Sequence, residues 1–468
     1  MTKQEAAIKY ITENYLDYNR LRHDVIADKL QVRLLGDEAK GKRQEYWREM
    51  TKHDINSIVC HCAQEYDANI TSREVMTALQ SDLIPDVHPL REYVLSCGEW
   101  TEEQPDWIDF VASQVHVRES ATDRCEAPVD RHFVAVDGRS AAPVVFHNES
   151  TASNTSELQC SASETNYSEA PHSSQSERSK ADLLWRTCFK KWFVAMVASW
   201  MKDEVVNHQV LVLIGKQGIF KTTWLEHLIP PHLRAYACKL ANSNELNKDE
   251  RLRIAEFGLI SLDEIDSMNN RELNQLKSVI TATDVNERAA YAYTKERRVR
   301  LASFCASGNR RDFLTDITGN RRWLPFEVES IQNPFYTTLP YELIYAQAWA
   351  LAQDPTFSYW FELDEIEVLE EHNRHFRDES NEEQLLPILF DVPAEGKGEF
   401  MTTAQISERL VTYGNIKKPM ALSRLGMVLA NGGYRAVTRK AGSGRARGWI
   451  VYQRDNDEIM SLKRLLKD

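Results

Sequence analysis

Glycine, lysine and threonine residues in one short segment have the spacing of a phosphate-binding loop. Residues 215–222, GKQGIFKT, approximate the pattern G-x-x-x-x-G-K-[ST] between an apolar run at 209–214 and a helical pattern at 222–229. In such a loop, backbone N–H groups at a helix N-terminus surround phosphate oxygens, the lysine reaches the β- and γ-phosphates, and the hydroxyl binds Mg²⁺. The candidate residues for ATP are therefore Gly215, Gly218, Lys221, Thr222 and Thr223, with Thr222 as a magnesium ligand.

One position of this loop departs from the pattern. The residue before the lysine is Phe220, where glycine is usual. A phenylalanine at positive φ would cost roughly 1–2 kcal/mol. The loop either bears that cost or bends differently while still using Gly218. The alternative is an ordinary glycine-containing turn before a helix.

Polar residues follow two further apolar strands. Asp263 and Glu264 directly follow the apolar run LISL at 259–262, and Asn309 is the last residue of the segment 300–309. Paired acids in this place fit a Walker B motif, in which Asp263 binds magnesium through water and Glu264 polarises the attacking water. Asn309 is placed to sense the γ-phosphate. The alternative is an acidic loop that merely ends a strand.

An arginine pair comes next along the chain. Arg321 and Arg322 follow a Gly-Asn dipeptide in the segment 312–328. An arginine can stabilise charge on a transferring phosphoryl group, often from a neighbouring subunit. The alternative is a structural or surface pair.

The order GKQGIFKTT, LISLDEID, SFCASGN and FLTDITGNRRWLPF resembles the virulence-associated E family. That family belongs with the superfamily 3-type helicase and primase-helicase ATPases of phages and mobile elements. The resemblance covers roughly residues 10–110 and 185–330. It implies catalytic roles for Lys221, Glu264, Asn309 and either Arg321 or Arg322. It also implies that ATP and Mg²⁺ bind between subunits of a ring such as a hexamer. No primase motif is recognised in this sequence, so we expect any priming to come from another protein.

Two basic segments suggest contact with DNA. The first, 293–300, carries Lys295, Arg297, Arg298 and Arg300 against one acid. The resemblance places a hairpin at 293–300 in the channel of a ring, where Lys295, Arg297 and Arg298 would contact phosphate; an exposed basic hairpin is the alternative. Residues 402–414, 419–433 and 434–454 read as helix, helix and hairpin, the order of a winged helix. Nine basic residues and no acid lie between 417 and 454. We expect Arg439, Lys440, Arg445 and Arg447 to contact phosphate and the second helix to approach the major groove; protein contact is the alternative.

These motifs require an α/β fold, because apolar strands alternate with helices from 210 to 280. We expect a P-loop, AAA+-like ATPase core with a mostly helical N-terminal domain and a winged-helix-like C-terminal domain. A hairpin is predicted at 17–34. Ten serines in residues 147–180 predict a flexible linker or insertion. The predicted domains are 1–137 (helical), 138–180 (linker), 181–335 (ATPase core), 336–390 (acidic connector) and 391–468 (basic).

Composition narrows the class of protein. The net charge of −13 excludes a uniformly basic surface. The eight cysteines show no disulfide pattern, and Cys60 and Cys62 are read as buried thiols on a helix rather than zinc ligands. No signal peptide or membrane span is predicted, which places the chain in the cytoplasm. The acidic run at 362–383 is expected to be a solvated helix face.

These observations predict an ATP-dependent DNA helicase-type motor that serves replication of a phage, plasmid or integrated element. Two alternatives stay open. One is a DNA-binding replication or regulatory protein with a weak nucleotide site. The other is a nucleotide-gated switch that acts on protein partners.

Overall fold

The computed structural model describes residues 2–34, 46–66, 69–119, 179–240, 253–287, 296–314, 320–393, 398–441 and 444–465. The serine-rich segment at 147–178 therefore lies outside the described residues. The chain divides into two units. The first unit comprises Met1–Ile265, Arg271–Asn309 and Phe326–Glu365, and the second comprises Asp266–Asn270, Arg310–Pro325 and Ile366–Asp468. The mixed α/β class is confirmed, whereas the bounds of the five predicted domains stay predictions.

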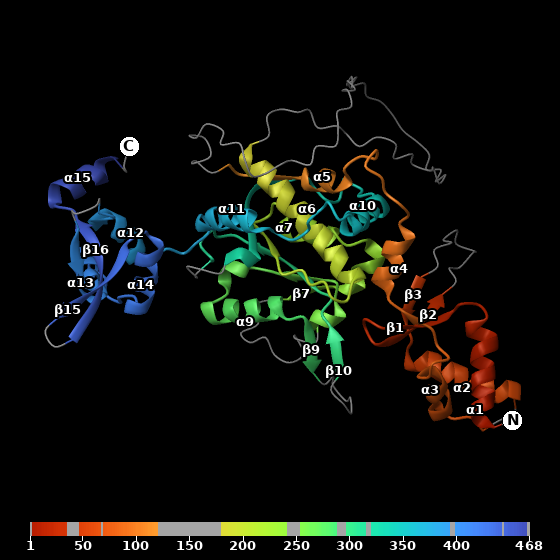
Figure 1. The fold of residues 1–468 in the computed structure, drawn as a ribbon. Coiled ribbons are helices and arrows are strands. Elements are labelled where there is room, and N and C mark those ends of the chain that lie inside the picture. The colour runs from red at the N-terminus through yellow and green to blue at the C-terminus, as the bar shows by residue number, and fades with distance from the viewer. Residues whose placement is uncertain are drawn as a thin grey trace, which may run out of the picture. The chain divides into compact units, whose positions relative to one another are not determined.

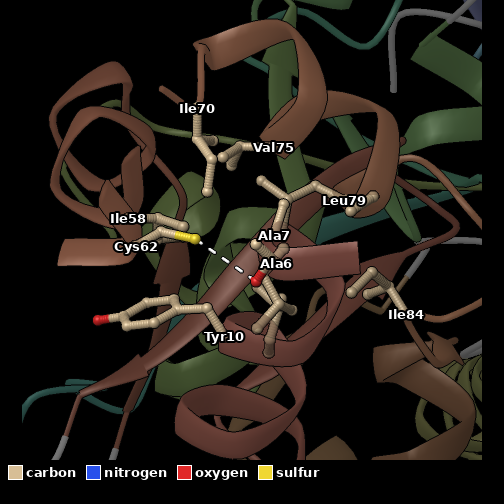
Figure 2. Packing of buried hydrophobic residues seen from close by; sticks show 12 residues of the cluster. Ala6, Ala7, Tyr10, Ile58, Cys62, Ile70, Val75, Leu79 and Ile84 are labelled. Carbon is tan, nitrogen blue, oxygen red and sulfur yellow. Dashed lines mark hydrogen bonds between the residues drawn. The ribbon is translucent and has the colours of Figure 1, made fainter. Parts of the chain in front are cut away.

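Three helices form a small core near the N-terminus. They are α1 (Lys3–Ile11), followed by the π-helical turn η1 (Thr12–Leu16), then α2 (Lys52–Tyr66) and α3 (Ser72–Leu79). Capping boxes start α1 at Thr2 and α3 at Thr71. The apolar faces of the three helices meet, and the Cys62 thiol donates to the Ala6 carbonyl at 3.5 Å (Figure 2). Cys62 is buried as predicted, but Cys60 is exposed.

A four-stranded sheet adjoins these helices in the order β3-β2-β1-β4. Its strands are β1 (Leu21–Asp24), β2 (Lys29–Leu34), β3 (Tyr46–Glu49) and β4 (Asp86–Val87). The predicted hairpin is confirmed, since β1 and β2 pair antiparallel. Asp28 has a φ of 54° in the turn between them.

A six-stranded sheet forms the core of the first unit, in the order β5-β12-β6-β11-β8-β7. Its strands are β5 (Val115–Val117), β6 (Val210–Gly215), β7 (Ala237–Leu240), β8 (Leu259–Leu262), β11 (Ser303–Gly308) and β12 (Trp323–Ile331). Strands β7, β8, β11 and β6 are mutually parallel. Every residue of β6, β8 and β11 is buried, which explains their continuous apolar sequences.

Helix α6 (Lys180–Met201) packs on this sheet, and residues 191–200 are all buried. It lies beside α4 (Pro89–Ser96), α5 (Trp107–Ala112) and α10 (Tyr341–Gln353) (Figure 1). Its tryptophans anchor it, because the Trp192 indole donates to the Phe304 carbonyl and the Trp200 indole to the Gly258 carbonyl, both at 3.1 Å. In the described ranges, no helix combines the length and apolarity needed to cross a membrane.

Short elements connect the strands of the sheet. They are α7 (Lys221–His227), the 3₁₀ turns η4 (Pro231–Tyr236), η5 (Ile265–Ser267) and η6 (Asn320–Arg322), helix α9 (Asn270–Thr281), and the antiparallel hairpin β9 (Asp284–Glu287) and β10 (Glu296–Val299). Helix α11 (Leu363–Arg374) leads from the first unit into the second.

The second unit contains the predicted helix, helix and hairpin. These are α13 (Thr403–Gly414), α14 (Leu422–Asn431), β15 (Arg435–Ala441) and β16 (Gly444–Gln453). The sequence did not predict β13 (Phe390–Asp391), β14 (Glu399–Met401) or α15 (Asn456–Leu465). Helix α12 (Asn381–Leu389) adds Leu386 and Leu389 to the core that these elements share, although its residues fall within the predicted connector.

The acidic run at 362–383 is not wholly a solvated face. Glu382 and Glu383 are buried in the second unit. Glu382 accepts a hydrogen bond from the Met420 backbone, and Glu383 pairs with Arg377 at 3.4 Å. Glu382 therefore holds α12 to the loop before α14, while Glu383 pairs with an arginine that precedes α12, roles that a charge count cannot reveal.

Candidate functional site

The predicted phosphate loop connects the end of β6 to the start of α7. Gly215 has no room for a side chain, because a Cβ there would lie 2.6 Å from the Val328 carbonyl oxygen. Gly218 has a φ of 85°. Phe220 also has positive φ, at 66°, and precedes the first residue of α7. The loop therefore bends as the glycine-containing pattern requires, and Phe220 bears a backbone strain of roughly 1–2 kcal/mol.

Lys221 and Asn309 meet at the ends of two neighbouring strands. The buried ammonium of Lys221 donates to the carbonyls of Gly215 at 2.8 Å and Lys216 at 2.7 Å, and to Asn309 Oδ1 at 3.3 Å. Strands β6 and β11 are parallel neighbours, so residues that follow them share one edge of the sheet. The predicted lysine and the predicted sensor are thus brought together.

Thr222 and Asp263 meet at the same edge, with Ser307 between them. Asp263 Oδ1 accepts hydrogen bonds from Ser307 Oγ at 2.7 Å and Thr222 Oγ1 at 3.3 Å, and the two hydroxyls lie 3.1 Å apart. Asp263 Oδ2 lies 2.8 Å from Lys239 Nζ. Thr223 follows in the first turn of α7 and is half-buried. The geometry gathers hydroxyl and carboxylate oxygens beside a helix N-terminus.

The local charges keep the Asp263 carboxyl ionised. Burial by itself would raise the pKa of Asp263, but hydrogen bonds from Lys239 and Ser307 outweigh burial and lower it. The same hydrogen bond to Asp263 raises the pKa of Lys239. Glu264, the predicted base, follows with a φ of 52° and is exposed.

Sequence reasoning missed Ser307 and Lys239. Ser307 is a polar residue inside a buried strand, two positions before Asn309, and that placement was an available signal. Lys239 lies on β7 within a segment that carries no motif. Only the parallel pairing of β7 with β8 brings it to Asp263.

The predicted arginine pair belongs to the second unit. Arg321 is exposed and Arg322 is half-buried, both in η6. Asn373 of α11 donates to the Asn320 carbonyl at 2.9 Å and the Trp323 carbonyl at 3.0 Å. The two residues that flank the pair are therefore tied to one buried amide.

In the predicted DNA-contacting hairpin β9–β10, two arginines form ion pairs with carboxylates of the first unit. Arg297 pairs with Asp284 at 2.8 Å, and Arg298 pairs with Asp28 of the β1–β2 turn at 2.9 Å. Lys295 lies outside the described residues. Arg300, which was counted with this basic run, is buried and donates to backbone carbonyls, and its burial lowers its pKa to about 9. Arg300 is therefore a structural residue.

The cations of the second unit gather on β15 and β16. Arg439, Lys440, Arg445 and Arg447 are all exposed. Lys440 lies directly opposite Arg445, and Thr438 lies opposite Arg447, so Lys440, Arg445 and Arg447 share one face of the hairpin. Arg439 points to the other face, where its guanidinium lies 5.1 Å from the centre of the Phe400 ring.

One family model matches part of this chain. Residues 173–378 match the model of the virulence-associated protein E-like domain. None of the curated proteins matches the chain. The apo structure of the NrS-1 C-terminal region (305–718) aligns over 96% of this chain and 100% of that chain, with 10% identity and a TM-score of 0.40. Its A-form apo structure aligns over 96% and 99%, with 10% identity and a TM-score of 0.38.

The family match covers the phosphate loop, Asp263, Asn309 and the arginine pair, but not the resemblance noted at 10–110. Residues 173–378 thus match the model of the family that the motif series resembles.

Proposed function

We propose that the chain is an ATP-hydrolysing motor that acts on DNA during replication of a phage, plasmid or integrated element. One observation carries the proposal. Lys221 contacts Asn309, 88 residues away, and Thr222 contacts Asp263, 41 residues away. Four residues of a hydrolytic phosphate site thus converge at the carboxyl ends of parallel strands, where α/β sheets bind ligands. The finer fold assignment, a P-loop, AAA+-like core with a winged-helix-like C-terminal domain, is part of the proposal.

Each residue has a role in this proposal. The N-terminus of α7 receives the phosphates, and Lys221 exchanges its loop carbonyls for β- and γ-phosphate oxygens. Glu264 accepts the proton of the water that attacks the γ-phosphorus, and ADP leaves. The oxygens of Thr222 and Asp263 suit magnesium, which when bound neutralises charge on the phosphates. Asn309 orients the γ-phosphate.

The test is ATP hydrolysis by the purified chain, with and without single-stranded DNA. We expect DNA to stimulate turnover in the wild type. Lys221→Ala should abolish turnover while DNA binding persists, and Glu264→Gln should abolish turnover while nucleotide binding persists. Glu370→Gln, the same change at an exposed site on α11, is the matched control and should retain activity.

Two results would refute this assignment. The first is unchanged turnover in Lys221→Ala. The second is an absence of turnover in every condition with DNA binding intact, which would favour a DNA-binding protein with an inactive nucleotide site. A nucleotide-gated switch would instead hydrolyse ATP without salt-dependent affinity for DNA.

We also propose that the arginine pair acts across subunits of a ring. Lys221→Ala and the double variant Arg321→Ala/Arg322→Ala should each be inactive alone. In a mixed ring, some interfaces would combine an intact phosphate loop with an intact arginine pair. Partial recovery of turnover on mixing supports sharing between subunits, whereas no recovery places the pair in its own subunit's site or outside catalysis.

The hairpin β15–β16 is the proposed duplex-binding surface. Like charges directly opposite on neighbouring strands are destabilising, and Lys440 faces Arg445 in this way. Other arginines of the unit pair with carboxylates, but no described carboxylate pairs with Lys440, Arg445 or Arg447. A polyanion would relieve this repulsion. DNA phosphate is therefore the ligand that the hairpin fits.

Helix α14 is a poorer candidate than expected for reading the major groove. Its exposed side chains include Leu422 and Met427, and its one cation, Arg424, lies 3.9 Å from Glu383. The hairpin, rather than this helix, supplies the charge. The contact would then follow the phosphate backbone and show little sequence preference.

Salt dependence of duplex binding tests this surface. Three phosphate contacts give log K against log salt a slope of about −2.7 from the hairpin alone, and each neutralised cation should reduce the slope by about 0.9. The variants are Lys440→Gln, Arg445→Gln and Arg447→Gln. Lys417→Gln/Lys418→Gln, at two exposed lysines before α14, is the control. An equal loss of slope in the control would contradict a specific role for the hairpin.

A further inference from the structure

Lys239 occupies one side of the Asp263 carboxylate. It lies on β7 opposite Ser261 of β8, and the parallel pairing carries its side chain toward the strand end where Asp263 lies. Its Nζ is 2.8 Å from Asp263 Oδ2, while Ser307 and Thr222 occupy Oδ1. Both oxygens of the carboxylate are therefore engaged.

This arrangement opposes a divalent cation at Asp263. A cation near Oδ2 would lie beside the Lys239 ammonium, and two like charges a few ångströms apart repel. Within the described ranges, no group of three or more histidine, cysteine, aspartate or glutamate side chains could hold a metal ion. A divalent ion at this edge of the sheet therefore binds weakly until a ligand supplies further oxygens.

The side chain of Lys239 has the freedom to move. Its exposed fraction is 47%, and that of Asp263 is 33%. A lysine carries a compact charge on a flexible four-carbon stem, so it can turn from a carboxylate to a phosphate without moving the strand. An ion pair this exposed is weak and readily exchanged.

We propose that Lys239 is a displaceable cation that occupies Asp263 until a nucleotide arrives. The phosphates then attract the ammonium, Asp263 is released to the metal, and nucleotide and divalent ion bind cooperatively. Lys239 is thus a further residue of the nucleotide site. This inference rests on the proposed nucleotide site, but its central measurement needs no nucleotide.

The measurement is Mn²⁺ binding to the full chain without nucleotide, followed by electron paramagnetic resonance. Lys239→Met should bind Mn²⁺ about two- to fivefold more tightly than the wild type, the range expected for removal of a partly exposed ion pair. Lys239→Arg keeps the cation and should bind as weakly as the wild type. Lys239→Met/Asp263→Asn should lose the gain.

Lys216→Met is the matched control, since it removes an exposed lysine of the phosphate loop that has no ion pair with Asp263. A gain confined to Lys239→Met supports the proposal. Equal gains in both variants, or no gain in Lys239→Met, would overturn it and leave Lys239 as a surface ion pair.

A second readout separates this inference from the proposed function. The affinity for a fluorescent ATP analogue is measured in EDTA and in Mg²⁺. The affinity in Mg²⁺ divided by the affinity in EDTA should be smaller in Lys239→Met than in the wild type. An unchanged ratio would contradict the displacement. If no variant binds the analogue, the nucleotide site itself is refuted, while the Mn²⁺ titration still decides whether Lys239 competes with a metal.

Discussion

The left-handed backbone of Phe220 leads to the prediction that glycine is more stable than alanine at this position. Phe220 has φ 66° and ψ 16°, a region that costs a residue with a Cβ roughly 1–2 kcal/mol. Alanine at this position keeps that cost, whereas glycine removes it. Phe220→Ala and Phe220→Gly both lose the ring. The difference between their free energies of unfolding therefore isolates the contribution of the backbone conformation.

The expected magnitude combines two opposing effects. Glycine removes the left-handed strain, but it also makes the unfolded chain more flexible, which costs about 0.4–1 kcal/mol. Phe220→Gly should therefore be more stable than Phe220→Ala by about 0.5–1 kcal/mol. Thr223 lies in the first turn of α7 with helical backbone, where glycine should instead be less stable than alanine by about 1 kcal/mol.

Urea unfolding of the four variants, followed by tryptophan fluorescence, measures both differences. Glycine should be more stable than alanine at position 220 and less stable than alanine at position 223. If glycine is less stable than alanine at both positions, the loop does not require a left-handed residue at 220. ATP turnover in Phe220→Gly then shows whether relief of strain also improves the nucleotide site.

Two other predictions concern packing and pH. Gly215→Ala places a Cβ 2.6 Å from the Val328 carbonyl oxygen and should destabilise the chain by about 1–3 kcal/mol. Gly426→Ala, in an open helical position, should instead stabilise the chain. The urea midpoints of the two variants and the wild type measure both effects. Burial lowers the pKa of His88 to about 4, and His88 caps α4 by accepting from the Arg91 N–H. Its protonation favours the unfolded state, so stability should fall by about 2 kcal/mol from pH 7 to pH 5. His88→Asn, which keeps a cap acceptor, should lose much of that dependence; an unchanged pH profile would assign it to other groups.

The sequence predicted the local elements of the site well, because each carries a local signal. Continuous apolar runs predicted β6, β8 and β11, and the glycines and lysine predicted the turn into α7. Positive φ at Phe220 follows from the loop pattern itself. The family match at 173–378 confirms the motif series. The roles of Glu264, Arg321 and Arg322 stay predictions.

Other features depend on pairing between distant segments. Charge counts grouped Arg300 with Arg297 and Arg298, yet tertiary contacts bury Arg300 and pair Arg298 with Asp28. They also predicted a solvated acidic face in which Glu383 is buried. A count along the chain records which charges are present but not which backbone or side chain will lie beside them.

The sequence by itself determined the strands, the bend of the predicted phosphate loop and the residues at the strand ends, because periodicity and glycine placement act within a few residues. Only the tertiary structure decided what surrounds Asp263. Lys239 and Ser307 reach it from β7 and β11, the two strands that flank β8. That order depends on how the whole sheet buries its apolar faces, which no local pattern encodes.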